Sequence, residues 1–277
     1  MSARLSKGRG SARRPAAQAG PGLFVEERQA KIIEYVEAHR KATVAQLCQH
    51  FGVSSATIRN DLRDLETSRL ILRAHGGAMV KTKTGFELDS SQKQVRNLEA
   101  KRRIAEAAAR LIEDGDIVLL DTGTTALEVA RRLAGRRNLT VVTNDLEIAR
   151  LLEEGDSLQV VVMGGILRKG FHCTVSYGTS ERQALEGLSV DKAFMGVNSF
   201  TLRRGASTPD IRHAETKKAM IAIATSVILL CDSSKFGRTS FVQFARPEEI
   251  DAIITDGLPE AERLKLEEHG IQVIIAQ

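Results

Sequence analysis

The sequence contains no tryptophan, and aromatic residues make up only 4% of its 277 positions. No apolar run approaches the roughly 18 residues that a membrane-spanning helix needs, so we expect no membrane segment. The positively charged N-terminus "MSARLSKGRGSARRPAAQAGPG" is followed by no apolar segment and is not expected to be a secretory signal. What remains is an ordinary globular composition, 42% hydrophobic and 27% charged.

Cysteine is scarce as well. Cys48, Cys173 and Cys231 lie far apart, and no C-x-x-C pair occurs. This spacing argues against a disulfide framework and against a zinc site, and it is typical of proteins of the reducing cytosol. We therefore expect a cytoplasmic protein without a metal site and without a cofactor.

The excess of positive charge is confined to the first third of the chain. Residues 1–100 contain 17 Lys and Arg against 10 Asp and Glu, a balance of +7, whereas the remainder contains 23 and 25, a balance of −2. This asymmetry indicates that the first third meets a polyanion, most simply nucleic acid. A basic tail that only keeps the protein in solution is the plainer alternative.

Hydrophobic periodicity divides the chain into a small helical part and a larger α/β part. Residues 1–22 are predicted to be a disordered basic arm, 23–82 a winged helix-turn-helix domain, 83–95 a linker and 96–277 an α/β domain. Within the α/β domain, short apolar runs alternate with helical segments: "DIVLLD", "LTVVTN", "LQVVVMGG", "DKAFMGV", "SVILLCD", "DAIITDG" and "IQVIIAQ". Such runs are typical of a parallel sheet covered on both faces, so we predict a Rossmann-like fold for this domain.

Residues 42–80 contain the succession of elements that a DNA reader needs. Thr43 is expected to cap a short helix that ends at Gly52, and Ser54 or Ser55 to cap a second helix running to about Leu65. The stretch "LILRAHGGAMV" then predicts two strands around a Gly-Gly turn. Helix, turn, helix and wing follow one another at suitable lengths.

The second of these helices has an apolar stripe of Ile58, Leu62 and Leu65, which leaves small, hydroxyl, amide and guanidinium groups on its other surface. Arg can bond to guanine, Asn can pair with adenine, and Ser or Thr can bind phosphates. The predicted DNA-binding residues are Ser54, Ser55, Ala56, Thr57, Arg59, Asn60, Arg63, Arg73 and His75. A three-helix packing module whose polar surface only meets water is the alternative.

The stretch "VSSATIRNDLRDLE" followed by "RAHGGA" resembles the winged helix-turn-helix of the DeoR family of bacterial sugar-responsive transcriptional regulators. The resemblance covers nearly everything after residue 25 and continues through "DTGTT", "VVTND", "MGG", "DKAFMG", "AETKKAM", "CDSSKFG" and "IITDG". It implies a regulator, most often a repressor, that joins the nucleoid when bound to DNA. It also implies an effector domain similar in fold to ribose-5-phosphate isomerase. One departure is Asn60, which stands where the family usually has a second Arg.

Polar residues follow the apolar runs, and they are expected to gather at the carboxyl edge of the sheet, where ligands bind. Gly123 allows the backbone to approach a ligand, and amides at the helix start that follows attract anions. Lys217 and Lys235 can supply positive charge for a phosphate. The predicted effector-binding residues are Asp121, Gly123, Thr124, Thr125, Thr143, Asn144, Gly164, Gly165, Lys217, Asp232 and Lys235.

Each of these residues also has a plainer interpretation. The two aspartates, Asp121 and Asp232, could only cap helices. Lys217 and Lys218 could form a solvated helix surface, and Gly164-Gly165 could be a simple turn. Their joint occurrence at successive strand ends favours a ligand site.

Turnover of a sugar phosphate is less favoured than sensing. The similar isomerases carry an acidic pair shortly after a glycine on a central strand, and many family members hold an acid near the position of Asn198. Here "FMGVNSF" places Val197, Asn198 and Ser199 in that stretch, and an amide or a hydroxyl cannot act as a base at neutral pH. Asp121 is the remaining candidate base, although its place beside the phosphate loop suits hydroxyl binding better. His172 and Cys173 are expected in a loop between strands, with a structural or ligand-adjacent role.

The leading hypothesis is a transcriptional regulator that binds double-stranded operator DNA as a homo-oligomer and responds to a phosphorylated sugar or polyol effector. One alternative is a sugar-phosphate isomerase with an appended DNA-binding domain. Another is a DNA-binding protein whose α/β domain only drives oligomerisation.

Overall fold

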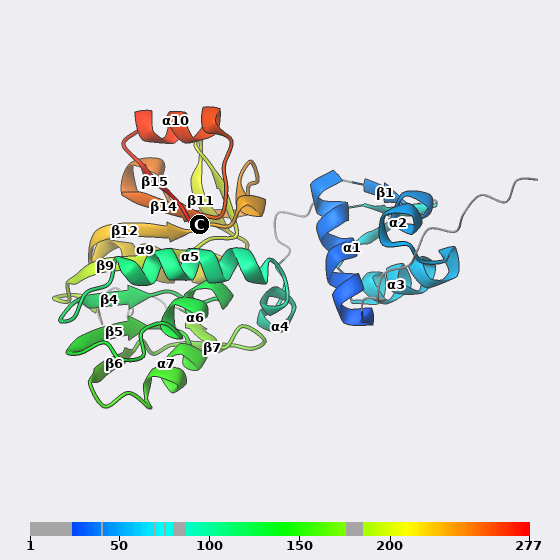
Figure 1. Cartoon of the computed structure of the whole chain (residues 1–277). Helices are drawn as coiled ribbons and strands as arrows, with labels where there is room; N and C mark the ends of the chain where they lie inside the picture. Colours follow the sequence, from blue (N-terminus) through cyan, green and yellow to red (C-terminus); the bar gives the residue numbers. More distant parts are fainter. Residues whose placement is uncertain (1–23, 40, 69, 75, 80–86, 176–184) are drawn as a thin grey trace, which may run out of the picture. The chain divides into compact units, whose positions relative to one another are not determined.

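The computed structural model divides the chain into two compact units, residues 1–80 and 81–277 (Figure 1). The structure describes residues 24–39, 41–68, 70–74, 76–79, 87–175 and 185–277. The predicted basic arm, His75 and residues 83–86 of the predicted linker lie outside the described residues.

The first unit contains three helices and a small antiparallel sheet. Its elements are α1 (Val25–His39), β1 (Lys41–Thr43), α2 (Val44–Phe51), α3 (Ser55–Thr67), β2 (Leu72–Ala74) and β3 (Gly77–Met79), with strand order β1-β3-β2. The predicted stripe of Ile58, Leu62 and Leu65 is buried against α1 and α2, in a core that also contains Ile32 and Leu47. The predicted helix-turn-helix and wing are therefore confirmed.

The helix boundaries follow from local chemistry. Thr43 accepts a hydrogen bond from the amide of Gln46, whose side chain in turn accepts one from the amide of Thr43. Gly52 ends α2 in a left-handed conformation with φ of 66°. Of the two candidate caps for α3, Ser54 is the one used, and its side chain accepts from the amide of Thr57.

Strand β1 was not foreseen from the sequence. It pairs with β3, and Gly77 lies opposite Thr43. A Cβ atom at position 77 would lie 2.1 Å from the carbonyl oxygen of Ala42, so only glycine permits this approach. One of the two glycines of the predicted turn is thus needed for strand pairing.

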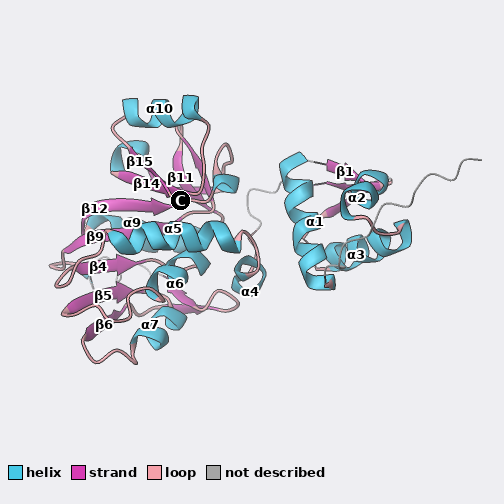
Figure 2. Cartoon of the chain, viewed as in Figure 1, coloured by secondary structure: helices cyan, strands magenta, loops and turns pink. Residues whose placement is uncertain are grey.

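The second unit is built on a seven-stranded sheet in which every neighbouring pair is parallel (Figure 2). Its strands are β4 (Ile117–Leu120), β5 (Leu139–Thr143), β6 (Leu158–Val162), β9 (Val190–Gly196), β12 (Ala224–Leu230), β14 (Ala252–Thr255) and β15 (Gln272–Ile275). Each of the seven apolar runs of the sequence is one of these strands. The predicted Rossmann-like parallel sheet is confirmed.

Both faces of the sheet are covered, and a hydrophobic core lies on each. On one face pack α5 (Leu98–Arg110), α6 (Thr124–Ala130) and α7 (Leu146–Leu152), as Figure 1 shows. The other core includes residues of α9 (Ile211–Ala222), α10 (Glu260–Glu268), β10 (Ser199–Thr201), β11 (Gly205–Thr208) and β13 (Val242–Ala245). The remaining short elements are α4 (Ser90–Gln94), β7 (Ile166–Arg168), β8 (Cys173–Val175), η1 (Ser233–Lys235) and η2 (Pro247–Glu249). Among the described residues, no helix is both long and apolar enough to cross a bilayer.

The order β15-β14-β12-β9-β4-β5-β6 places a switch point in the middle of the sheet. From β4 the chain proceeds outward through β5 and β6, and it then returns to β9, beside β4, and proceeds the other way. In open parallel sheets, ligands bind beyond the carboxyl ends of the two strands that flank such a point. Here those ends are Leu120, which precedes Asp121, and Gly196.

The stretch predicted as a loop around His172 is in part a hairpin. Strands β7 and β8 pair in antiparallel register, and Cys173 of β8 lies opposite Arg168 of β7. His172 has a positive φ of 55° in the turn between them. The sequence pattern gave no indication of these strands because each is only three residues long.

Candidate functional site

Helix α3 presents the predicted DNA-binding groups on its exposed side. Ser54, Ser55, Ala56, Arg59, Asn60 and Arg63 are exposed and Thr57 is half-buried. The side-chain oxygen of Asn60 accepts a hydrogen bond from Arg63 at 2.9 Å. Arg73 of β2 donates to the carbonyl oxygen of Arg59 at 3.4 Å, so the wing strand contacts the exposed helix. An amide and guanidinium groups therefore lie together on one exposed surface.

Asp121 is the most deeply enclosed of the predicted effector residues. It follows β4 with 0% of its surface exposed. Its Oδ2 accepts a hydrogen bond from the amide of Gly196 at 2.8 Å and another from the ammonium group of Lys217. Lys217 also donates to the carbonyl oxygen of Gly196 at 2.8 Å. The two strands at the switch point and helix α9 are thus joined through one carboxylate.

The charge on Asp121 is stabilised by its neighbours. Burial alone would raise the pKa of this carboxyl, but Lys217 and His213 together outweigh burial and hold the pKa below its ordinary value. His213, four residues before Lys217 on α9, has a lowered pKa because it is buried and because Lys217 is close. Asp121 and Lys217 therefore form a buried ion pair, and His213 lies beside it.

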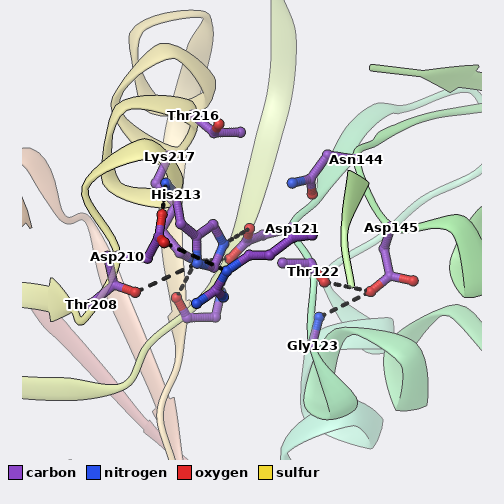
Figure 3. Close-up of polar contacts among 12 residues, drawn as sticks. Asp121, Thr122, Gly123, Asn144, Asp145, Thr208, Asp210, His213, Thr216 and Lys217 are labelled. Carbon is purple, nitrogen blue, oxygen red and sulfur yellow. Dashed lines mark hydrogen bonds and ion pairs between the residues drawn. The ribbon is translucent and has the colours of Figure 1, made fainter. Parts of the chain in front are cut away.

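Several buried polar atoms around Asp121 make no hydrogen bond to any described residue. They are Oδ1 of Asp121, Oδ1 of Asn144, Nη1 of Arg168 and Nε2 of His213. Figure 3 shows His213 and Asp121 pointing toward one another. Nε2 of His213 lies 3.9 Å from Oδ1 of Asp121, beyond hydrogen-bond distance. Buried polar atoms are normally bonded, so a group of unbonded ones indicates a place for polar ligand atoms.

The loop between β4 and α6 is held by Asp145. Oδ2 of Asp145 accepts from the hydroxyl of Thr122 at 2.6 Å and from the amide of Gly123 at 3.2 Å (Figure 3). Gly123 has φ of 131°, a conformation that suits glycine. Thr124 and Thr125 are half-buried in the first turn of α6, where helix geometry leaves amides without an intrahelical acceptor.

The end of β5 contributes mainly through the side-chain amide of Asn144. Asn144 donates through Nδ2 to the carbonyl oxygen of Thr174 at 2.8 Å, which leaves its own carbonyl oxygen available. The hydroxyl of Thr143 accepts from the amide of Asp145 at 3.1 Å. Thr143 is therefore engaged in holding the local backbone, whereas Asn144 can still accept a bond from a ligand.

A second charged group surrounds Asp232. This carboxylate caps η1 and accepts a hydrogen bond from Nδ2 of Asn97 at 2.9 Å, and Lys235 lies 3.8 Å away. The plainer interpretation of Asp232 as a cap is therefore correct in part. Lys101 of α5 belongs to the same group, since its charge interacts with those of Asp232 and Lys235.

Lys101 was not among the residues predicted from the sequence. It is 5% exposed, and its ammonium group donates to the carbonyl oxygen of Lys93, the one hydrogen bond that this side chain makes among the described residues. Burial, followed by the positive charge of Lys235, lowers the pKa of Lys101 to about 7. The signal was present, because Lys101 shares a helix face with the buried Ile104, Ala105 and Ala108. A lysine within an apolar stripe marks a buried charge.

Glu87 was not predicted either, and here the sequence gave no signal. It is not part of a helix or strand, and its side chain is 5% exposed. Its carboxylate accepts hydrogen bonds from Lys93 at 2.5 Å, from Arg168 at 2.7 Å and from Nδ2 of Asn198 at 3.0 Å. An acid therefore lies next to Asn198 after all, although it comes from a distant part of the chain.

Comparison with known proteins identifies the chain's relatives. A model described as "DeoR-like helix-turn-helix domain" matches residues 28–84, and one described as "DeoR C terminal sensor domain" matches residues 96–257. The chain belongs to the DeoR family. Family membership makes the first unit a DNA-binding domain and the second a sensor domain, as expected from the resemblance.

Curated relatives of the family match over nearly their full length. The HTH-type transcriptional regulator GlpR of Haloferax volcanii is 41% identical over 91% of this chain and 98% of its own. The HTH-type transcriptional repressor GlcR of Bacillus subtilis is 34% identical over 92% and 98%. Among solved structures, ribose 5 phosphate isomerase A from Neisseria gonorrhoeae matches with a TM-score of 0.37 and 16% identity, covering 50% of this chain and 53% of that one.

Not all predicted effector residues of this family member lie with Asp121. Gly164 and Gly165 are exposed in the turn between β6 and β7, and a Cβ on Gly165 would lie 2.4 Å from the carbonyl oxygen of Val175. Gly165 thus serves the packing of the β7–β8 hairpin, in line with the plainer interpretation. Lys217 and Lys218 differ, because Lys217 is 1% exposed while Lys218 is an exposed residue paired with Glu215.

Proposed function

We propose that this DeoR-family protein is a sequence-specific repressor of carbohydrate metabolism genes, and that its sensor domain binds a phosphorylated sugar or polyol. The observation that carries the effector proposal is the group of unbonded buried atoms on Asp121, Asn144, Arg168 and His213. It contains a carboxylate oxygen, an amide oxygen and two nitrogens, a mixture that suits hydroxyl groups, which both donate and accept. The proposal that the protein represses transcription is supported by its relative GlcR, which is a transcriptional repressor.

A phosphate group is suited to the other end of the site. Lys101 and Lys235 are positively charged groups near Asp232, and Lys101 makes no hydrogen bond to a carboxylate among the described residues. A buried ammonium is costly unless anions offset its charge, and an anionic ligand would add to the charge that Asp232 supplies. The site thus offers a charge for phosphate at one end and hydrogen-bonding groups for hydroxyls at the other.

Catalysis is not supported by the state of Asp121. Its carboxylate is held by Lys217 and by the amide of Gly196, and its pKa is lowered. A carboxylate whose pKa is low is a weak base, whereas a general base works best with a pKa near the working pH. We infer that Asp121 binds hydroxyls and does not move protons between carbons.

Regulation requires that the effector bind with different affinity to the DNA-competent and DNA-incompetent states. We expect the protein to bind as a homo-oligomer, because paired half-sites in an operator require paired reading helices. The test is fluorescence anisotropy on DNA from upstream of its own gene, titrated with ribose 5-phosphate, glucose 6-phosphate, fructose 6-phosphate and glycerol 3-phosphate. The unphosphorylated compounds serve as controls.

A tenfold shift of operator affinity by one phosphorylated compound corresponds to about 1.4 kcal/mol of coupling and would support the proposal. If the protein binds DNA tightly but none of the compounds binds the sensor domain or changes operator affinity, the effector proposal is wrong. An isomerase assay on the same compounds would then decide whether the protein is an enzyme instead.

A further inference from the structure

Glu87 connects three separate elements of the sensor domain through one carboxylate. Its partners are Lys93 on α4, Arg168 on β7 and Asn198, which follows β9. Such a buried carboxylate is stable only when it is paired and bonded, and here two cations and one amide meet that need. Although burial favours the neutral form, Lys93 and Arg168 hold the pKa of Glu87 well below its ordinary value. Glu87 is therefore ionised and can only accept hydrogen bonds.

The partners of Glu87 also belong to the effector site. Arg168 bonds Glu87 through Nη2, while its Nη1 is one of the unbonded buried atoms around Asp121. The charge of Glu87 acts on His213, whose Nε2 is another of these atoms. Glu87 thus lies beside the hydroxyl-binding end of the proposed site.

Lys93 joins this end to the proposed phosphate end. Its ammonium group contacts Glu87, and its backbone carbonyl accepts the hydrogen bond from Lys101. The carboxylate of Glu87 can only accept hydrogen bonds and suits hydroxyl donors, whereas the ammonium groups of Lys101 and Lys235 can only donate them and suit phosphate oxygens. The two groups therefore impose one orientation on a sugar phosphate.

The place of Glu87 in the chain is as informative as its contacts. It follows the first unit, which ends at residue 80, and it lies between the two family matches, 28–84 and 96–257. We propose that Glu87 is a specificity-determining residue of the effector site, supplied by the segment that connects the DNA-binding unit to the sensor. In this role its carboxylate accepts hydrogen bonds from effector hydroxyls and so ties that segment to the bound effector. This inference rests on the proposed function.

The test compares effector binding by the full-length wild type and by Glu87→Gln, using isothermal titration calorimetry. The ligands are the sugar phosphate that binds the wild type most tightly and, as the reference, inorganic phosphate. We expect Glu87→Gln to weaken binding of the sugar phosphate at least tenfold, because glutamine lacks the anionic acceptor. Inorganic phosphate, which has no hydroxyl-bearing carbon chain to present to Glu87, should bind equally well or better.

A swapped variant guards against a mere folding defect. In Glu87→Gln with Asn198→Asp, the carboxylate and the amide exchange places, so the net charge and a hydrogen bond between the two positions are both kept. We expect this double variant to recover part of the sugar-phosphate affinity lost in Glu87→Gln. Recovery would show that a carboxylate at this place, and not only a stable fold, determines effector affinity.

Hydrogen exchange tests whether Glu87 ties the connecting segment to the bound effector. In the wild type, the sugar phosphate should slow exchange of the amides in residues 87–95, and in Glu87→Gln at saturating ligand this slowing should be lost. If a sugar phosphate binds the wild type and Glu87→Gln binds it equally well, the inference about Glu87 is overturned while the proposed function stands. If neither sugar phosphates nor inorganic phosphate bind the wild type, the proposed function fails and this inference fails with it.

Discussion

Arg28 of α1 donates two hydrogen bonds, of 2.7 Å and 3.0 Å, to the carboxylate of Asp61 on α3. Asp61 is buried among the apolar residues of α3, on the side opposite the exposed arginines. This pair fixes α3 against α1, the first helix of the DNA-binding unit. The sequence suggested a purely apolar inner face, so the ion pair is an addition to the predicted picture.

Asp61→Ala should destabilise the DNA-binding unit by about 2 kcal/mol, since a charged hydrogen-bonded pair is lost and Arg28 stays beside an apolar core. Hydrogen exchange of the α3 amides in the full-length protein would measure the change. Asp64→Ala is the matched control, because Asp64 is exposed and its side chain makes one long contact of 3.5 Å, with Gln29. Equal protection of α3 in both variants would contradict this role of the pair.

Arg59 and Arg73 should contribute differently to DNA binding. If Arg59 reads a base, Arg59→Ala should cost about 1–3 kcal/mol on the operator and relax the sequence preference at one position. Arg73→Ala in the wing should weaken binding to all DNA sequences alike. It should also reduce the slope of log K against log salt concentration by about one. Anisotropy titrations at several salt concentrations, on the operator and on point-mutated operators, separate the two effects.

The affinity for phosphate should depend on pH through Lys101. Its ordinary pKa is 10.5 and its pKa in the folded protein is about 7, so the ammonium group is lost as the pH rises above about 7. A phosphate dianion needs the charged form, so its Kd should rise by up to about tenfold per pH unit above that point. Lys101→Arg, which remains charged, should flatten this dependence. A wild-type Kd that does not change between pH 7 and pH 9 would exclude Lys101 from the phosphate site.

The lowered pKa of Lys101 also affects the stability of the ligand-free protein, and there a rise in pH is favourable. Because the unfolded chain binds the proton of Lys101 more tightly than the folded protein, stability should rise as the pH increases from about 7 toward 10.5. Lys101→Met should remove this slope and stabilise the ligand-free protein below pH 7. Urea unfolding across this pH range measures both expectations, with Lys265→Met on the exposed surface of α10 as the control.

Asp121→Asn should remove both stability and effector binding, and the two losses can be separated. Without the carboxylate, the buried ammonium of Lys217 lacks its anionic partner, at a cost of about 3–5 kcal/mol. The double variant Asp121→Asn with Lys217→Met should recover most of this stability while effector binding stays lost. Recovery of effector binding in the double variant would show that Asp121 acts only as the partner of Lys217.

The fold could be predicted almost entirely from the sequence, and the reason is periodicity. Seven apolar runs separated by helices have few alternatives to a covered parallel sheet, and the caps of α2 and α3 are local signals. The short strands β1, β7 and β8 could not be predicted, because three residues carry no period. They form only when distant residues, such as Gly77 and Ala42, come into contact.

The candidate site could be predicted in part, because some of its residues directly follow predicted strands. Asp121, Asn144 and Asp232 follow strands, so the rule that parallel strands end at one edge located them. Glu87 lies in a segment without secondary structure, and only the tertiary fold brings it to Asn198, 111 positions further along the chain. Gly164 and Gly165 follow a strand as well, but β6 is the outermost strand, away from the switch point.

The order of the two units along the chain matters while the protein is being made. The DNA-binding unit ends at residue 80 and has its own hydrophobic core, whereas Lys217 and Asp232 come much later. A ribosome that adds about 5–20 residues per second needs on the order of ten seconds to synthesise the intervening chain. During that interval a nascent chain already carries its reader of DNA but no finished sensor. We therefore expect a nascent chain to complete its DNA-binding unit before it has a sensor domain that an effector could bind.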